Sequence, residues 1–196
     1  RSALDALQYA RERGDPAHLE NRHALSHLGL INPADYPRFL EQNAAAAFTA
    51  VWAYPDEWTI NLEIPTLGRE RVDKLYPIRS IHEAGGVIVG ASDWNYGELD
   101  PLVSIETAVT RQDPYGPSEL KATTHEAVGL ETIIEAYTIN AAWLMHRENV
   151  TGSIELGKLA DIVIFDTNLF EIEAEAISNA KVDTTIYNGR VVYRVN

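Results

Sequence analysis

The stretch Val87-Ile88-Val89-Gly90-Ala91, followed by Ser92-Asp93-Trp94, decides the fold class of this chain. Its first five residues are all apolar or small, which is typical of a strand that is buried on both faces of a parallel sheet. Gly85-Gly86 ends the helical pattern before it, and Asp100-Pro101 starts the next helix with a capping carboxylate and a proline. The stretch therefore predicts a buried strand between two helices, with a carboxylate just beyond its end.

Helical and strand patterns alternate on both sides of this stretch. Residues 44–51 are a second run of small apolar residues and predict another buried strand. The segment 52–69 is expected to be a long, aromatic-rich loop. Further helices are expected at residues 3–12, from Asn32-Pro33, at residues 71–84 with a break at Pro77, and at residues 130–144. Such alternation favours right-handed βα units and a parallel sheet, so the predicted fold class is α/β.

The pattern changes after Arg147. Residues 162–165 predict a strand, and residues 184–187 and 190–195 predict two more. Asn188-Gly189 joins the last two, and both residues accept the positive φ of a tight hairpin turn. We therefore expect a barrel-type part at residues 1–146 and a small β domain at residues 147–196.

Composition and charge restrict the function classes. The chain has 196 residues, 45% hydrophobic and 23% charged, with a formal net charge of -13, which fits a globular cytoplasmic protein. The negative field disfavours nucleic acid and anionic membranes as partners, and no apolar run approaches the ~20 residues of a membrane span. Because cysteine is absent, a metal site would have to use histidine and carboxylate ligands.

Two residues at predicted strand ends can do chemistry. Asp93 lies two positions beyond the strand 87–91, and His27 ends a short strand candidate within residues 21–30. In parallel α/β folds, sites form at the carboxyl ends of the strands, where a carboxylate and an imidazole can bind a metal. Local spacing alone favours a turn role for Asp93 and, for His27, a partly buried histidine with an ordinary hydrogen-bond partner.

Aromatic and basic residues supply candidates for a substrate pocket. Trp52 and Trp94 can line an apolar pocket, although packing within the core is an equally good interpretation. Arg71 or Arg111 can hold a substrate carboxylate, although a surface or ion-pair role is favoured for each of them.

Separate segments in the right order resemble one family. They lie at residues 90–94, 100–102, 108–111, 137–142, 152–161 and 182–193, with a looser match at Arg22-His23 and His27. Together they resemble the amidohydrolase family 3 branch of the amidohydrolase superfamily, which includes N-substituted formamide deformylase-like proteins. Residues 152–161 resemble the superfamily's C-terminal signature, which is the most specific of these matches.

The resemblance implies a (β/α)8 TIM barrel with a side β-sandwich and hydrolysis of a C–N bond in a small-molecule substrate. It implies a divalent metal, zinc in the first place, with His27 as a ligand and Asp93 as ligand and general base. Two positions depart from the family pattern, since Ser26 replaces a glutamate and Asn95 replaces a proline. Both positions touch the expected pocket, so they put the substrate in doubt.

By this resemblance the chain holds strands 6 to 8 of the barrel, and the family's other metal-binding histidines are missing from it. We therefore expect a partner, which is either the missing N-terminal half or a second copy in a homo-oligomer. Two hypotheses follow. The chain is part of a metal-dependent amidohydrolase, or it is a catalytically incompetent fragment that acts as a binding or assembly module.

Overall fold

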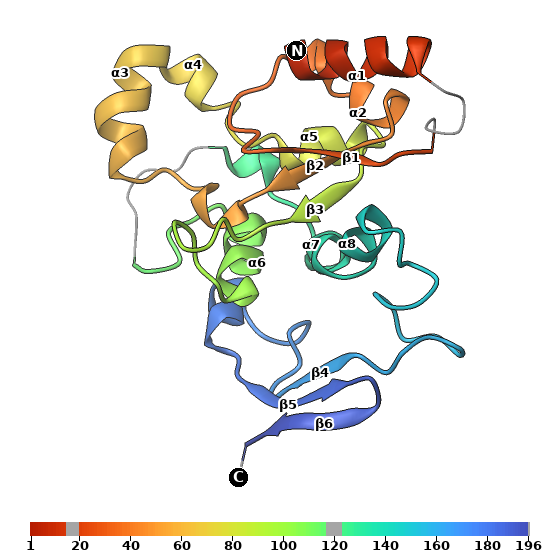
Figure 1. Cartoon of the computed structure of the whole chain (residues 1–196). Coiled ribbons are helices and arrows are strands. Elements are labelled where there is room, and N and C mark those ends of the chain that lie inside the picture. The colour runs from red at the N-terminus through yellow and green to blue at the C-terminus, as the bar shows by residue number, and fades with distance from the viewer. Residues whose placement is uncertain (15–19, 117–122, 196) are drawn as a thin grey trace.

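A three-stranded parallel sheet lies at the centre of the larger part of the chain (Figure 1). The structure is a computed structural model and describes residues 1–14, 20–116 and 123–195. The strands are β1 (His23–Ser26), β2 (Ala44–Phe48) and β3 (Ile88–Gly90), hydrogen-bonded in the order β1-β2-β3. All pairs are parallel, so the predicted α/β class with a parallel sheet is confirmed.

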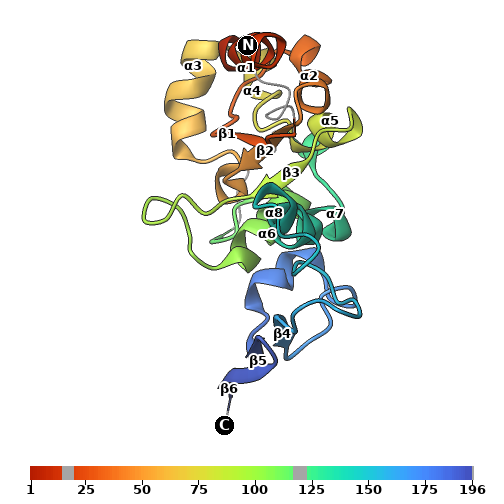
Figure 2. The ribbon, with the colours of Figure 1, turned by 45° about the vertical axis from the view of Figure 1, so that its right-hand side comes forward.

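Helices lie on both sides of this sheet, with α1 and α2 on one side and α6, α7 and α8 on the other (Figure 1, Figure 2). The helical elements are α1 (Ser2–Arg13), η2 (Pro33–Asp35), α2 (Arg38–Glu41), η3 (Ala50–Trp52), η4 (Thr59–Glu63), α3 (Ile64–Leu67), α4 (Arg69–Val72), α5 (Ile78–Glu83), α6 (Pro101–Thr110), η5 (Thr124–Glu126), α7 (Leu130–Tyr137), α8 (Ile139–Leu144) and η6 (Ala174–Asn179).

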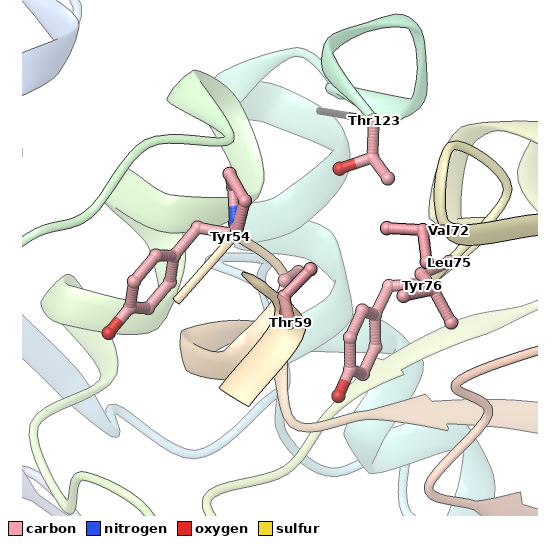
Figure 3. A pocket seen from close by; sticks show the side chains of 8 residues that line it. Tyr54, Thr59, Val72, Leu75, Tyr76 and Thr123 are labelled. Carbon is pink, nitrogen blue, oxygen red and sulfur yellow. The ribbon is translucent and has the colours of Figure 1, made fainter. Parts of the chain in front are cut away.

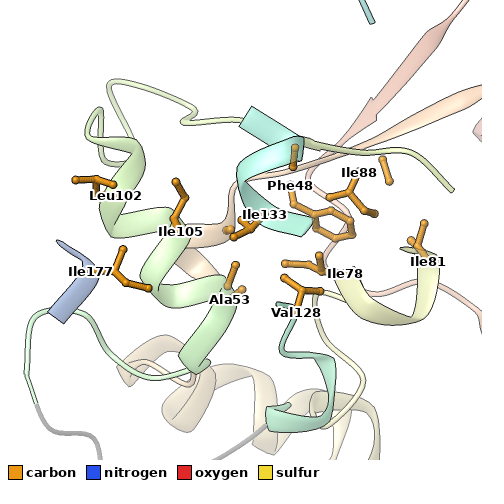
Figure 4. Close-up of a cluster of buried hydrophobic side chains, with 14 of the residues drawn as sticks. Phe48, Ala53, Ile78, Ile81, Ile88, Leu102, Ile105, Val128, Ile133 and Ile177 are labelled. Carbon is orange, nitrogen blue, oxygen red and sulfur yellow. The ribbon is translucent and has the colours of Figure 1, made fainter. Parts of the chain in front are cut away.

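The hydrophobic core lies between the sheet and the helices that follow it. All five residues of β2 are buried, and four of them are alanines, whose small side chains leave room for close packing on both faces. Figure 4 shows the cluster beside α6 and α7, where aliphatic side chains surround Phe48. Its labelled members are Phe48, Ala53, Ile78, Ile81, Ile88, Leu102, Ile105, Val128, Ile133 and Ile177.

Two predicted helix starts are confirmed by their caps. The Asn32 side chain accepts a hydrogen bond from the backbone N–H of Ala34 at 3.0 Å, and Pro33 begins η2. The Asp100 carboxylate accepts one from the N–H of Leu102 at 2.9 Å, and Pro101 begins α6. In both cases a short polar side chain satisfies an N–H that the first helical turn leaves unpaired.

The prediction of a long loop at residues 52–69 is wrong, because much of this segment is helical. The Asp56 carboxylate accepts hydrogen bonds from the N–H and the hydroxyl of Thr59 at 2.7 and 2.9 Å, at the start of the π-helical turn η4. Pro65 lies in the first turn of α3, where its missing N–H would have had no partner in any case. A proline that suggested a loop is therefore compatible with a helix.

The segment expected as one broken helix at residues 71–84 forms two short helices, α4 and α5, and α5 begins directly after Pro77 as predicted. The strand expected at residues 44–51 ends at Phe48, because Ala50–Trp52 turns into η3. This turn brings Trp52 back over the end of the sheet.

The chain ends in a second, antiparallel sheet of β4 (Ile162–Phe165), β5 (Val182–Tyr187) and β6 (Arg190–Arg194). The predicted hairpin is confirmed, with positive φ at Asn188 (49°) and Gly189 (75°). This sheet lies at the far end of the structure from α1 (Figure 1). The domain boundary near residue 146 stays a prediction. Within the described ranges, each helix is too short or too polar to cross a lipid bilayer.

Helices α7 and α8 pack against strand β3. The Asn140 side-chain amide donates to the carbonyl of Ile88 at 3.0 Å. Gly90 lies against the ring of Tyr137, and a Cβ added at Gly90 would stand 2.4 Å from two carbons of that ring. Because a strand residue with a side chain cannot fit there, the contact fixes how closely α7 approaches the strand that leads to Asp93.

This contact predicts the effect of Gly90→Ala. The added methyl group should force the Tyr137 ring or the strand to move, and such overpacking costs about 1–3 kcal/mol of unfolding free energy. Urea denaturation measures this loss. Gly116→Ala is the matched control, since a Cβ there meets no atom of the described residues within 4 Å. Equal stabilities of the two variants would contradict the packing argument.

Arg22, the residue before β1, ties that strand to the end of α8. Its guanidinium donates two hydrogen bonds to the Glu148 carboxylate, at 2.9 and 2.7 Å. It also donates to the carbonyl of Trp143 and lies 4.6 Å from the centre of the Trp143 ring. Since β2 is the one strand that pairs with β1 in the described part of the chain, this contact anchors an otherwise unpaired edge.

The Arg22–Glu148 ion pair predicts a contribution to acid sensitivity. The hydrogen bonds from Arg22 lower the pKa of Glu148 from 4.5 to about 2. Because the pKa is lower in the folded state, the stabilisation is present above pH 4.5 and is lost as the pH falls toward 2. Urea denaturation between pH 6 and pH 3 should therefore show a smaller fall in stability for Glu148→Gln than for the unmodified chain. Glu131→Gln, at an exposed position of α7, should retain the full fall, and identical profiles for all three proteins would refute the assignment.

Candidate functional site

The carboxyl ends of the three parallel strands meet at one edge of the sheet. His27 directly follows β1, and Thr49 directly follows β2. Asp93 lies three positions after Gly90, the last residue of β3. Because the strands are parallel and in register, residues that are far apart in the sequence come together at this edge.

His27 and Asp93 face one another there. The Nε2 atom of His27 lies 3.8 Å from an Oδ1 atom of Asp93, and the two side chains are 56% and 35% exposed. The distance is too long for a direct hydrogen bond. Zn–N and Zn–O bonds are about 2.0–2.2 Å long, so two ligands of a tetrahedral ion lie about 3.3–3.6 Å apart. A small movement of either side chain would therefore let His27 and Asp93 bind a single metal ion that is open to solvent.

Trp52 forms one wall beside this pair. Its ring stacks on the His27 imidazole with ring centres 5.8 Å apart and an angle of 18° between the planes. The helical turn η3 positions the tryptophan, so all three parallel strands contribute to the same edge. The stacking restricts the orientation of the imidazole and keeps its Nε2 atom directed at Asp93.

Both candidate metal ligands have an unusual backbone conformation. His27 and Asp93 adopt left-handed conformations, with φ of 56° and 50°. The Asp93 carbonyl accepts hydrogen bonds from the N–H groups of Tyr96 and Gly97 at 2.8 and 2.9 Å. A Cβ at Gly97 would lie 1.9 Å from the carbonyl oxygen of Ser92, so this tight turn requires glycine. Left-handed non-glycine residues cost free energy and are concentrated at functional sites.

The pair is not a complete metal site by itself. Among the residues that the structure describes, no three histidine, aspartate or glutamate side chains gather as a metal-binding group. Zinc sites in enzymes have three or more protein ligands as a rule. His27 and Asp93 can therefore hold a metal ion firmly only together with ligands from elsewhere.

The other predicted pocket residues are more scattered. Trp94 follows Asp93 in the sequence and is 67% exposed, so its side chain packs on little. Arg71 is exposed on α4 and takes no part in the contacts between His27, Trp52 and Asp93. Arg111 is fully buried and donates its hydrogen bonds within the protein, so a role in binding a substrate carboxylate is wrong.

No sequence pattern indicates the small recess between η4 and α4 that Figure 3 shows. Its cavity volume is about 10 Å³, far below the roughly 300–1,000 Å³ of typical ligand pockets. Burial of the Tyr76 side chain raises the pKa of its phenol to about 12. The phenol of Tyr76 therefore stays protonated. Its lining residues are Ala53, Tyr54, Pro55, Thr59, Val72, Leu75, Tyr76 and Thr123. Because neither donor residue lines this recess, the chemistry is assigned to the sheet edge.

Comparison with known proteins identifies the family. A family model described as "Amidohydrolase family" matches residues 1–193. The N-substituted formamide deformylase of Arthrobacter pascens is 33% identical over 121 residues, which are 61% of this chain and 22% of that protein. The chain spans about a quarter of the length of the curated relatives it matches.

Solved structures share the fold. An uncharacterized metal-dependent hydrolase from Pyrococcus horikoshii has a TM-score of 0.70 and 20% identity, covering 88% of this chain and 33% of that one. An adenosine deaminase from Xanthomonas campestris, solved with bound zinc, has a TM-score of 0.59 and 17% identity, covering 87% and 37%. With the family model matching nearly its whole length, the chain belongs to the amidohydrolase family.

Proposed function

We propose that this chain carries part of the active site of a metal-dependent hydrolase that cleaves a C–N bond of a small-molecule substrate. The observation that carries the proposal is the approach of His27 Nε2 to Asp93 Oδ1 at 3.8 Å on the carboxyl edge of the sheet. Membership of the amidohydrolase family and the fold shared with a metal-dependent hydrolase support it.

The donor set favours zinc. An imidazole nitrogen and a carboxylate oxygen are common ligands of catalytic zinc, and the chain has no cysteine. His27 would bind through Nε2 and Asp93 through a carboxylate oxygen. When bound, the ion lowers the pKa of water to about 7 and polarises the substrate carbonyl.

Asp93 would also act on protons. Its carboxylate is partly open to solvent, so it can take a proton from the attacking water and pass it to the leaving nitrogen. Trp52 would orient the imidazole, and Trp94 and Arg71 stay candidates for contacts with the substrate. Because Ser26 and Asn95 depart from the family pattern, the substrate's identity is left to those candidates and to residues outside this chain.

We further propose that the parallel sheet is part of a (β/α)8 barrel, about strands 6 to 8. The neighbouring strands follow one another in the sequence order β1-β2-β3 and alternate with helices, as they do around a barrel. The remaining metal ligands would come from the missing N-terminal half of the barrel or from a second copy of the chain. The need for further ligands and the short span relative to the relatives support this part of the proposal.

Substitutions of the two donors test the proposed site. In the longest form of the protein that can be expressed, Asp93→Asn should lower kcat/KM on an amide substrate by about 10²–10⁴-fold, since the general base is lost. His27→Asn should reduce bound zinc, measured by elemental analysis of the purified protein. Asparagine is chosen at both positions because it tolerates a left-handed backbone.

Asp113→Asn is the matched control for these variants. Asp113 accepts a hydrogen bond from the N–H of Tyr115 at 2.8 Å, and asparagine can accept the same bond. Circular dichroism should show the same fold for all variants. Undiminished turnover and zinc content in Asp93→Asn would rule out the proposed role of this carboxylate.

One observation favours the alternative of a binding or assembly module. The antiparallel sheet exposes apolar side chains on both faces of β6, among them Val191, Val192 and Tyr193, and exposed apolar surface often marks contact surfaces. Size-exclusion chromatography and zinc analysis of residues 1–196 distinguish the two. The hydrolase proposal predicts zinc uptake that rises when the chain is combined with its N-terminal half, whereas a lack of zinc uptake both alone and in that combination supports the alternative.

A further inference from the structure

We infer that Arg111 is a positioning residue for the loop that carries His27. The inference rests on the proposed function for what His27 does, but the contacts that carry it are independent of any metal. Arg111 lies at the end of α6 and is 1% exposed, so its guanidinium is completely enclosed by protein. A buried cation is costly unless its N–H groups find acceptors, and the acceptors of this one identify its role.

The guanidinium of Arg111 donates hydrogen bonds to two backbone carbonyls and to one side-chain hydroxyl. Its Nη2 donates to the Leu75 carbonyl at 3.0 Å, and its Nη1 to the Tyr76 carbonyl at 3.3 Å. Its Nε and Nη2 both donate to the hydroxyl of Thr123, at 3.2 and 2.8 Å. The planar, forked shape of the guanidinium suits such a set of fixed acceptors, and the single ammonium of lysine does not reproduce it.

From Tyr76 the hydrogen bonds continue to the candidate site. The N–H of Tyr76 donates to the carbonyl of Gly29 at 2.7 Å. The N–H of Gly29 in turn donates to the carbonyl of His27 at 2.8 Å. The turn that holds His27 is thus connected to Arg111 through the backbone of one residue, Tyr76.

The backbone along this path is strained. Eight non-glycine residues of the described part have positive φ, and four of them, His27, Tyr76, Arg111 and Thr123, lie on the path. For a β-branched residue such as Thr123 this conformation is uncommon. Strained residues persist where the surrounding structure holds them, and they cluster where geometry matters for function.

The turn after β1 depends on this connection because it has few other directional contacts. Ser26 and His27 are exposed, and β1 pairs with β2 alone among the described strands. Leu28 and Ile31 pack on the core, but apolar contacts restrict orientation less than hydrogen bonds do. The path from Arg111 therefore supplies the constraint that keeps the imidazole over Trp52 and facing Asp93.

Nuclear magnetic resonance on residues 1–196 tests the inference. In the unmodified chain, the stacked rings of His27 and Trp52 should give a nuclear Overhauser effect (NOE) between their protons. In Arg111→Lys this NOE should be lost or strongly weakened while circular dichroism shows that the chain is still folded. Zinc affinity should fall by about 10–100-fold, as for other residues that orient metal ligands.

Two further variants make the test decisive. Tyr76→Phe removes the phenol but keeps the backbone groups that form the path, so the NOE should remain. If Arg111→Lys does not fold, Thr123→Val removes the hydroxyl that accepts two of the Arg111 bonds and should weaken the NOE in a folded protein.

The outcomes separate this inference from the proposed function. An NOE that is absent from the unmodified chain, or unchanged in the folded Arg111→Lys or Thr123→Val variant, overturns the positioning role. Failure of the protein with its complete barrel to bind zinc counts against the proposed function alone, because the NOE reports the ring geometry without metal.

Discussion

The parallel hydrogen bonding of β1, β2 and β3 is the constraint on which the candidate site depends. His23 pairs with Ala44, and Ala46 pairs with Ile88, so the three strands end at nearly the same level. A slip of one residue in either pair would turn the side chains of a strand to the opposite face. His27 and Asp93, 66 positions apart in the sequence, can meet only because this register is kept.

The contacts around the sheet maintain that register, and the pair at its edge contributes little to stability. An exposed ion pair is worth about 0–1 kcal/mol, whereas a left-handed conformation costs a non-glycine residue roughly 1–2 kcal/mol. His27 and Asp93 both have such a conformation and are both partly exposed. The arrangement of His27 and Asp93 therefore lowers the stability of the fold by more than the contact between them raises it. This is expected for residues that serve a site and not the fold.

Much of the fold could be predicted from local patterns, and the contacts that fix the site could not. The strand before Asp93, the capped helix after Asp100 and the Asn188-Gly189 hairpin each depend on residues close in sequence, and all three are confirmed. The helical turns within residues 52–69 could not be predicted, because Pro65 and Asp56 suit a helix start as well as a loop. The acceptors of Arg111 at Leu75 and Tyr76 lie about 35 positions away, and no local pattern indicates them.

The most direct test of the central claim is an anomalous-difference map, recorded at the zinc absorption edge, from crystals of the zinc-loaded protein with its complete barrel. The account predicts a peak between His27 and Asp93, within about 2.0–2.2 Å of Nε2 and of a carboxylate oxygen. A zinc ion bound elsewhere, with these two side chains making no contact to it, would contradict it.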